Sequence, residues 1–411
     1  MKKSLFEFLI VCMGVVAGQV VFADVLPELT ICSGHDYTIQ SGSERPYGGN
    51  QDNWGWMSYS CQEKCPGNFM DCVYPCPENG IPFMCVAFVV DSMGGVVRYT
   101  ENRGEPGPTV LIHEPGSGTR WDFTWIARRL MQDGVKVAQV KWERGGFLII
   151  SALHVPYWGG AGWFTRPDSK PTTIQALSRR PGAVIKWVHD NLATHGKKYG
   201  TIGCSGGSLA TSSAMYWHRV DEKTRLIDIV DYQYLTGLVP YYDFGDFCTK
   251  SHDNPGICEN DPCRNCISDT DCGGGGLNRC AFLDVSWITS AVVPIPDLID
   301  YIHMSKPDER CLDGKVPLGV ENSSMKYTQG FRDLGHTRLD FVVGEGSSSL
   351  WFLGDTFMGL TAGAAYVYRE FRGGRESWYD YEGYYHCASL IQPELIPETI
   401  RLIEKGLGMK K

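Results

Sequence analysis

The 411-residue sequence lacks a second long apolar run, an excess of positive charge and any internal repeat. Beyond the N-terminus no stretch approaches the length of a membrane span, so we expect none. The net charge of −9 argues against nucleic acid as a partner, because phosphate backbones are bound by Lys and Arg. The acidic turn at 269–273 lacks the later bidentate Glu of a calcium loop. We therefore predict no metal and no cofactor.

The first residues have the pattern of a secretory signal peptide. Lys2 and Lys3 precede an apolar stretch over 5–21, and Ala23 provides the small residue that a signal peptidase needs before Asp24. A membrane-anchoring helix is the alternative, but the run is short for one. We predict a cleaved signal peptide at 1–23 and a secreted or periplasmic protein.

The 16 cysteines agree with export. Because so many cysteines are rare in a reducing compartment outside metal sites, they indicate disulfide bonds. Loss of Cys12 with the signal peptide leaves an odd number. We expect Cys204 to be the free thiol and the others to form seven bridges, whose pairing the sequence does not give.

Beyond residue 23, the composition of the chain changes three times, at about residues 84, 232 and 336. Residues 24–83 are rich in Gly, Pro and Cys and predict a cysteine-rich N-terminal extension, whereas 84–231 read as the first part of a folded core. Residues 232–335 predict a cysteine-rich cap insertion, and the core resumes at 336–411. Within the core, strands alternate with amphipathic helices, which predicts an α/β fold with a mainly parallel central sheet flanked by helices.

The expected strands are apolar runs bounded by turn residues. Three helices are expected. The first spans 120–132, with Trp121, Trp125, Ile126 and Leu130 on one face, and the second runs from Pro181 to about 192. The third closes the chain, with Ile396, Ile400, Ile403 and Leu407 on one face. The strands are expected at 85–90, 96–100, 109–113, 135–140, 199–203, 339–343 and 364–368.

The segment Gly203-Cys204-Ser205-Gly206-Gly207 carries the clearest chemical signal. It is a Gly-x-Ser-x-Gly motif directly after an expected strand and before an expected helix, which predicts a sharp turn that presents Ser205 as a nucleophile. The glycines allow neighbouring backbones to approach. The N–H of Gly206 would face an oxyanion at the positive end of the helix. Cys204 should face inward as a small buried residue rather than act as a reactive thiol.

The stretch from about 84 to 404 resembles the α/β-hydrolase superfamily, in particular its secreted esterase- and lipase-like members with a cysteine-rich cap. Besides the motif at Ser205, residues 113–118 resemble the His-Gly loop after the third strand, and 142–147 resemble the Asp-x-Arg-Gly-Phe turn after the fourth. The resemblance implies that Gly116 provides the second oxyanion-hole amide, since Pro115 has no N–H. Glu114 departs from the family, which usually has glycine there.

The resemblance also implies a catalytic triad in the chain order Ser, acid, His. His386 is the best base, because it follows the last expected strand and precedes the closing helix. The acid should follow the strand at 339–343, where the family's usual Asp is replaced by Ser347. Glu345 is favoured because it lies nearest to the strand end, and Asp355 is the alternative.

These residues predict hydrolysis of carboxylic esters, of a small molecule or a polymer, through an acyl-enzyme on Ser205. A serine aminopeptidase on the same fold is an alternative, and a catalytically silent binding protein is another, suggested by Glu114 and Ser347. Trp158 and Trp163, in a Gly-spaced aromatic loop, either wall the substrate pocket or pack under the cap. The sequence does not indicate the oligomeric state.

Overall fold

The computed structural model describes the residues that form the core and several shorter segments. The described residues are 25–31, 37–41, 55–59, 73–78, 81–100, 106–115, 118, 121, 123–142, 149–150, 156–157, 162–164, 172–237, 248, 256–258, 261–266, 280–281, 310–311, 314–317, 333–346, 368, 375–382, 384 and 386–409. The predicted signal peptide lies outside them.

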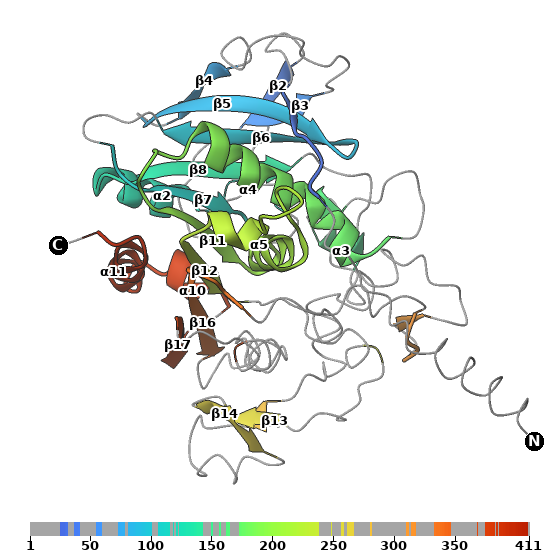
Figure 1. The fold of residues 1–411 in the computed structure, drawn as a ribbon, viewed down its shortest axis with the longest axis vertical. Helices are drawn as coiled ribbons and strands as arrows, with labels where there is room; N and C mark the ends of the chain where they lie inside the picture. The colour runs from blue at the N-terminus through green and yellow to red at the C-terminus, as the bar shows by residue number, and fades with distance from the viewer. Residues whose placement is uncertain are drawn as a thin grey trace, which may run out of the picture.

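A ten-stranded mixed sheet forms the centre of the molecule (Figure 1). Its order is β1-β5-β6-β8-β7-β11-β12-β16-β17, and β4 pairs with β5 along the same edge as β1. The strands from β8 to β17 in this order are parallel, whereas β5 and β6 run antiparallel to their neighbours. The expectation of a mainly parallel central sheet is confirmed. The strands are β1 (Thr30–Ile31), β4 (Val73–Glu78), β5 (Ile81–Val90), β6 (Met93–Thr100), β7 (Thr109–His113), β8 (Lys136–Trp142), β11 (Tyr199–Cys204), β12 (Tyr232–Thr236), β16 (Arg338–Gly346) and β17 (Glu376–Glu382).

Short strands outside the central sheet make three small sheets. They are β2 (Tyr37–Ser41) with β3 (Gly55–Tyr59), β9 (Ile149–Ile150) with β10 (Pro156–Tyr157), and β13 (Gly256–Cys258) between β14 (Asp261–Cys266) and β15 (Cys280–Ala281).

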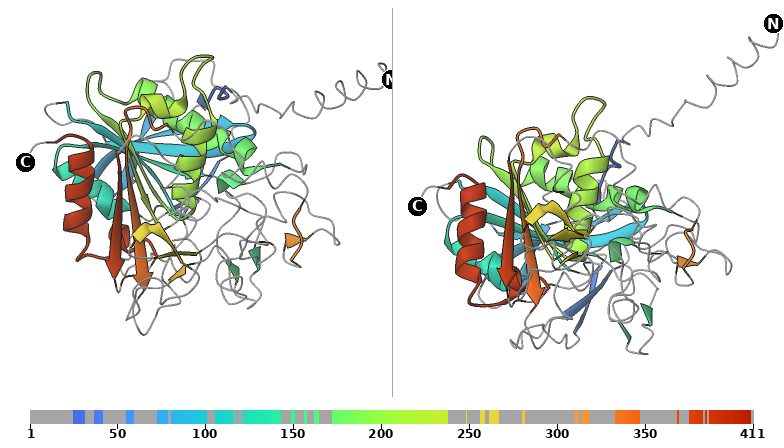
Figure 2. Two further views of the ribbon diagram at one scale, coloured as in Figure 1. Left: turned by 60° about the horizontal axis from the view of Figure 1, so that its bottom comes forward. Right: turned by 90° about the horizontal axis from the view of Figure 1, so that it is seen from below.

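Helices cover both faces of the central sheet (Figure 2). One buried cluster joins the sheet to α3 (Ile174–Leu177), α4 (Arg179–Asn191) and α5 (Gly206–Trp217), together with the 3-10 turns η3 (Gly162–Phe164) and η5 (Leu226–Ile229). A second cluster joins the opposite face to α2 (Thr124–Gln132), α10 (Ala388–Ile391) and α11 (Ile396–Gly406). The core is therefore a three-layer α/β sandwich.

The closing helix follows its expected pattern, and the helix after β7 does not. Ile400 and Ile403 of α11 are buried, as are Ile396 and Leu407 at its ends. By contrast, α2 begins at Thr124, and Trp125 is 43% exposed, so the prediction that Trp125 shares the buried face was wrong. The buried residues of α2 are Ile126, Ala127 and Leu130.

Two strands of the central sheet lie at positions where the sequence did not predict a strand of the core. Residues 232–236, which we placed in the cap insertion, form β12 between β11 and β16. The last strand of the sheet is β17 at 376–382, later than the strand expected at 364–368. Of that expected strand only Tyr368 is described, and its ring packs against Phe341 and Trp378.

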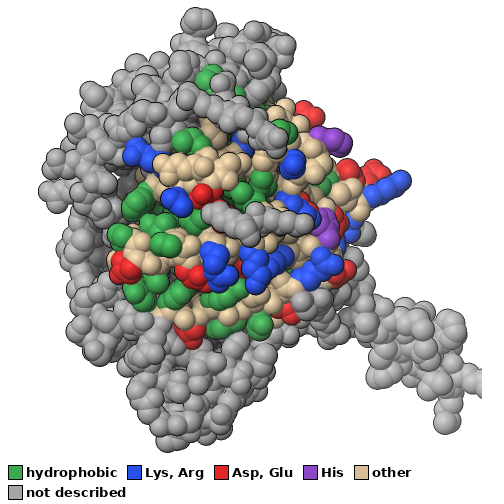
Figure 3. All heavy atoms as spheres, turned by 90° about the vertical axis from the view of Figure 1, so that its left-hand side faces the viewer, with side chains coloured by type: hydrophobic (Ala, Val, Ile, Leu, Met, Phe, Trp, Pro, Cys, Tyr) green, Lys and Arg blue, Asp and Glu red, His purple; other side chains and the backbone are tan. Residues whose placement is uncertain are grey.

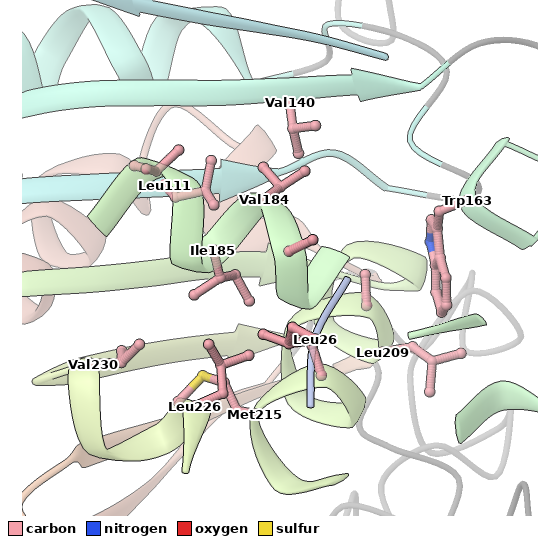
Figure 4. Close-up of a cluster of buried hydrophobic side chains, with 14 of the residues drawn as sticks. Leu26, Leu111, Val140, Trp163, Val184, Ile185, Leu209, Met215, Leu226 and Val230 are labelled. Atoms are coloured by element: carbon pink, nitrogen blue, oxygen red, sulfur yellow. The ribbon is translucent and has the colours of Figure 1, made fainter. Parts of the chain in front are cut away.

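The N-terminal extension contributes directly to the core. Strands β1 and β4 both pair with β5, along the edge opposite β6. Leu26 is 8% exposed and lies among side chains of α4 and α5 (Figure 4). A Cβ on Gly182 of α4 would lie 2.6 Å from Leu26 Cδ2, so the helix approaches this segment closely. The extension is thus packed on the main domain.

The surface over α2 and α11 carries a mixture of charges. Figure 3 shows Lys, Arg, Asp and Glu side chains interspersed with apolar ones on this face. Within the described part of the chain, no helix has both the length and the apolar composition needed to cross a membrane.

Leu26→Ala should lower the free energy of unfolding by about 2–4 kcal/mol, because it removes a buried side chain from a close-packed site. The neighbouring Val25 is 47% exposed, so Val25→Ala is the matched control, with a change within about 0.5 kcal/mol. Urea denaturation measures both. Equal, small effects would show that the N-terminal segment does not pack on the core.

Candidate active site

Ser205 lies in a strained turn between β11 and α5. Its φ of 52° and ψ of −123° place a non-glycine residue in a sparsely populated backbone region. Two backbone hydrogen bonds hold the turn: the Ser205 N–H donates to Thr236 O at 2.9 Å, and Leu209 N–H donates to Ser205 O at 3.0 Å. This is the strand-to-helix geometry that the Gly-x-Ser-x-Gly motif predicts.

Both glycines of the motif stand where a side chain does not fit. A Cβ on Gly203 would lie 2.6 Å from the backbone of Gly207 and Ser208. A Cβ on Gly207 would overlap the carbonyl group of His113 and lie 2.7 Å from Glu114 O. The first turn of α5 therefore packs directly on the end of β7 and the loop that follows it.

The expected oxyanion-hole residues come from these two segments. Gly206 is the first residue of α5, and N–H groups in a first helical turn have no acceptor within the helix. Gly116 lies outside the described residues, but the chain on both sides of it is placed. Gly118, with a φ of 71°, donates to Pro115 O at 3.1 Å, and its own carbonyl accepts from Trp142 N–H at 2.7 Å.

His386 follows β17 and lies next to the strand end that holds Ser205. Gly237 has a φ of 68°, and a Cβ there would lie 2.9 Å from His386 Cε1 and from the backbone nitrogen of Cys387. Gly237 directly follows Thr236, whose carbonyl accepts the Ser205 N–H. The predicted nucleophile and the predicted base thus both lie beside the Thr236-Gly237 pair.

A disulfide bond joins Cys204 to Cys387, with the two Cα atoms 5.7 Å apart. The expectation that Cys204 is a free thiol was wrong. Cys204 is fully buried, as expected. Cys387 adopts the left-handed conformation, with a φ of 61°, at the point where it bonds to Cys204. The bond connects the residue before the predicted nucleophile to the residue after the predicted base.

Hydrogen bonds through Thr236 add a second connection between the two loops. Ser208 Oγ in α5 donates to Thr236 O at 3.0 Å and accepts from Thr236 N–H at 3.2 Å. On the other side, Ser389 Oγ in α10 donates to Thr236 Oγ1 at 3.1 Å. Since α10 follows the His386 loop and lies beside β12 and β16 (Figure 1), Thr236 bonds to both helices, α5 after the Ser205 turn and α10 after the His386 loop.

The favoured acid lies at the same edge of the sheet. Strand β16 continues to Gly346, past the expected end at Gly344, and its pairing with β17 shifts register between Gly344 and Gly346, at Glu345. Three residues earlier, Val342 O accepts the N–H of Gly237 at 3.2 Å. This bond links β16 to Gly237, the residue beside His386. The side chain of Glu345, and all of Asp355, lie outside the described residues.

Glu114 does not oppose an oxyanion, because its side chain is engaged elsewhere. It is 1% exposed, and its carboxylate accepts from Gln139 Nε2 at 2.7 Å and from Phe123 N–H at 3.1 Å. The departure from the family at this position is therefore compatible with an oxyanion hole.

His113 and Trp163 are both buried. Burial lowers the pKa of His113 to about 3, so its imidazole is neutral at physiological pH. Trp163 is 1% exposed, stacks on Phe164 and accepts a hydrogen bond from Arg180 at its carbonyl, which fits the packing role that the sequence left open. Trp158 lies outside the described residues. Among the described side chains, no three His, Cys, Asp or Glu groups are close enough to hold a metal ion.

Sequence reasoning missed the disulfide and the part played by Thr236 and Gly237. The signal for the disulfide was present: a cysteine precedes Ser205, and another follows His386. Thr236 and Gly237 had no comparable signal, because their positions follow from the pairing of β12 with β11 and β16.

The double variant Cys204→Ala/Cys387→Ala should lower kcat for an activated ester at least roughly tenfold, because the two loops lose the covalent bond that holds Ser205 and His386 in position. It should also lose roughly 2–5 kcal/mol of unfolding free energy. The matched control is the disulfide Cys248–Cys311, whose removal should affect stability but leave kcat within about threefold. Equal effects on kcat would show that the first bond has no special role in the site.

Comparisons with known proteins found similar structures but no match to the sequence. No family model and no curated protein matches the sequence. The solved structures that resemble the chain include acetyl xylan esterase 1 from a Thermoanaerobacterium species, with 13% identity, a TM-score of 0.46 and coverage of 80% of this chain and 87% of that one. A thermostable carboxylesterase from a metagenomic library has 14% identity and a TM-score of 0.46, and covers 82% and 92%. An esterase from Pyrobaculum calidifontis has 15% identity and a TM-score of 0.43, and covers 77% and 79%.

The fold is assigned from the chain's own geometry. A mainly parallel sheet carries a strained serine between its central strand β11 and α5, the loop after β7 packs against that helix, and a histidine follows the last strand. These are the defining features of one superfamily. The chain has the α/β-hydrolase fold.

Proposed function

We propose that this protein is a secreted serine hydrolase that cleaves carboxylic esters through an acyl-enzyme on Ser205. The observation that carries the proposal is the link between the two loops: Ser205 has a strained φ of 52°, and the Cys204–Cys387 disulfide joins its turn to the residue after His386. Non-glycine residues held in such conformations concentrate at active sites. Burial lowers the pKa of His113 and makes it a poor proton acceptor, so we assign the proton transfer to His386.

In the proposed reaction, His386 takes the proton of the Ser205 hydroxyl as Oγ attacks the ester carbonyl carbon. The carbonyl oxygen becomes an oxyanion, which accepts hydrogen bonds from the N–H groups of Gly206 and Gly116. His386 then gives its proton to the departing alcohol, and the acyl group remains on Ser205. A water molecule, deprotonated by His386, attacks the acyl carbon, and the acid leaves as the proton returns to Ser205.

We assign the orienting acid to Glu345, with Asp355 as the alternative. Glu345 is the extra residue at the register shift between β16 and β17, so the sheet fixes its backbone at the edge that carries His386. An acid there would accept a hydrogen bond from the Nδ1–H of His386 and stabilise the charged imidazole. Asp355 would require the intervening chain to fold back to the same place.

The silent-scaffold alternative rested partly on Glu114, and the buried hydrogen bonds of its carboxylate remove that objection. A serine aminopeptidase would use the same residues, so the choice of ester over peptide remains part of the proposal. For location we propose export, because the bond between Cys204 and Cys387 requires an oxidising compartment. The substrate is an ester of a small molecule or polymer, with Trp158 as a proposed contact.

Ser205→Ala should lower kcat/KM for p-nitrophenyl acetate by about 10⁴–10⁶-fold, because the nucleophile and base act as a unit. Thermal stability should change little. Ser213→Ala in the same helix is the matched control, since Ser213 is fully buried and its hydroxyl has no hydrogen-bond partner in the described part of the chain. Undiminished turnover by Ser205→Ala would overturn the assignment of the nucleophile.

Glu345→Gln should reduce kcat at least roughly tenfold more than Asp355→Asn, because an amide cannot stabilise the charged His386 in the same way. Steady-state rates with p-nitrophenyl acetate measure both. A larger effect of Asp355→Asn would move the assignment to Asp355. If neither variant loses rate, another group orients His386.

A further inference from the structure

Glu114 stands at the start of the loop after β7, at the position where the superfamily usually has glycine. Its backbone and its side chain have different neighbours. The backbone carbonyl packs against Gly207, so that a Cβ on Gly207 would lie 2.7 Å from Glu114 O. The side chain turns into the protein and is 1% exposed. The residue therefore connects the face of α5 that carries Gly206 to the interior of the sheet.

A buried chain of hydrogen bonds holds the side chain. Gln139 in β8 donates from Nε2 to Glu114 Oε1 at 2.7 Å, and its own Oε1 accepts from Arg98 Nε in β6 at 2.9 Å. Arg98 and Gln139 are paired across β6 and β8, and both are nearly inaccessible to solvent. The guanidinium of Arg98 also lies 4.1 Å from the ring centroid of Trp121. The carboxylate and the guanidinium thus belong to one network in which Gln139 connects opposite charges.

The second carboxylate oxygen fixes the loop at its other end. Glu114 Oε2 accepts from the backbone N–H of Phe123, which immediately precedes α2. Negative charge near the start of a helix is favourable. Glu114 and Phe123 bracket the loop that contains Gly116, so one carboxylate ties its beginning to its end.

We propose that Glu114 is a positioning residue of the oxyanion hole. The Arg98–Gln139–Glu114 network fixes Glu114, at the start of the loop that contains Gly116, against the first turn of α5 that contains Gly206. Because hydrogen-bond donors must lie about 2.7–3.1 Å from the developing oxyanion, a small displacement of this loop lowers the rate. This inference rests on the proposed esterase function, which has its own test in the wild-type protein.

A reciprocal exchange tests the proposal. In Glu114→Gln, one of the two donors, Gln139 Nε2 or Phe123 N–H, faces an amide NH₂ group. In the double variant Glu114→Gln/Gln139→Glu, the new amide donates to the new carboxylate and still accepts from Phe123 N–H, while Arg98 retains an acceptor. The total charge is also unchanged. The hydrogen bonds are thus restored with reversed polarity.

The measurement is kcat and KM for p-nitrophenyl acetate, with the affinity for a trifluoromethyl ketone that mimics the tetrahedral intermediate. Glu114→Gln should lower kcat about 10- to 100-fold with KM within about threefold, and should weaken ketone binding in parallel. The double variant should recover kcat to within about threefold of the wild type.

Asp340 provides the matched control for simple loss of a buried carboxylate. It is fully buried and accepts from Tyr232 Oη at 2.9 Å and from Arg338 at 3.2 Å, and it lies on β16 two residues before Val342. Asp340→Asn should lower the denaturation midpoint and leave kcat within about threefold. Such a result separates loss of stability from loss of positioning.

Each outcome decides the proposal. If Glu114→Gln does not fold, recovery of activity in the double variant supports the network. An active wild type with an unchanged kcat in Glu114→Gln overturns it, as does a double variant that does not fold or does not recover. A wild type that neither turns over the ester nor binds the ketone overturns the proposed function itself, and the positioning proposal falls with it.

Discussion

The bond between Cys204 and Cys387 joins two segments that are 183 residues apart in the chain. Both segments have unusual backbones, because Ser205 has a φ of 52° and Cys387 a φ of 61°. Non-glycine residues in sparsely populated conformations are unfavourable by about 1–3 kcal/mol each and persist only where their surroundings determine them. Here the surroundings are the covalent bond, the end of β11 and the hydrogen bonds of Thr236. The geometry of the proposed active site depends on this combination.

The parallel sheet explains why these elements meet at one place. The carboxyl ends of β7, β11, β12 and β16 lie at one edge, so the loops that follow them converge there. Gly207, Gly203 and Gly237 allow these loops to approach more closely than any side chain would permit. Of the residues predicted to form the cap insertion at 232–335, 232–236 form β12, and Gly237, which follows them, lies beside His386.

The local features of the site could be predicted from the sequence, and the long-range ones could not. The strand-to-helix turn at Ser205 could be predicted because glycine spacing is a property of a short segment, whereas the catalytic roles of Ser205 and His386 stay predictions. The partner of Cys204 depends on which loops meet in three dimensions. Strand β17, with the sequence ESWYDYE, was missed because its residues are half-buried and polar, whereas the apolar run at 364–368 matched a strand better. Trp125 was misplaced because helical spacing suggests which residues share a face of a helix but does not show which of them the sheet buries.

The most direct test of the account is to treat the oxidised wild-type protein with a fluorophosphonate and to map the adduct by peptide mass spectrometry. This reagent forms a covalent bond with a serine that a neighbouring base has activated. The account predicts a single adduct on Ser205, absent when His386 is replaced by alanine. No adduct, or an adduct on another residue, would contradict the claim that the Cys204–Cys387 bond holds a working nucleophile and base together.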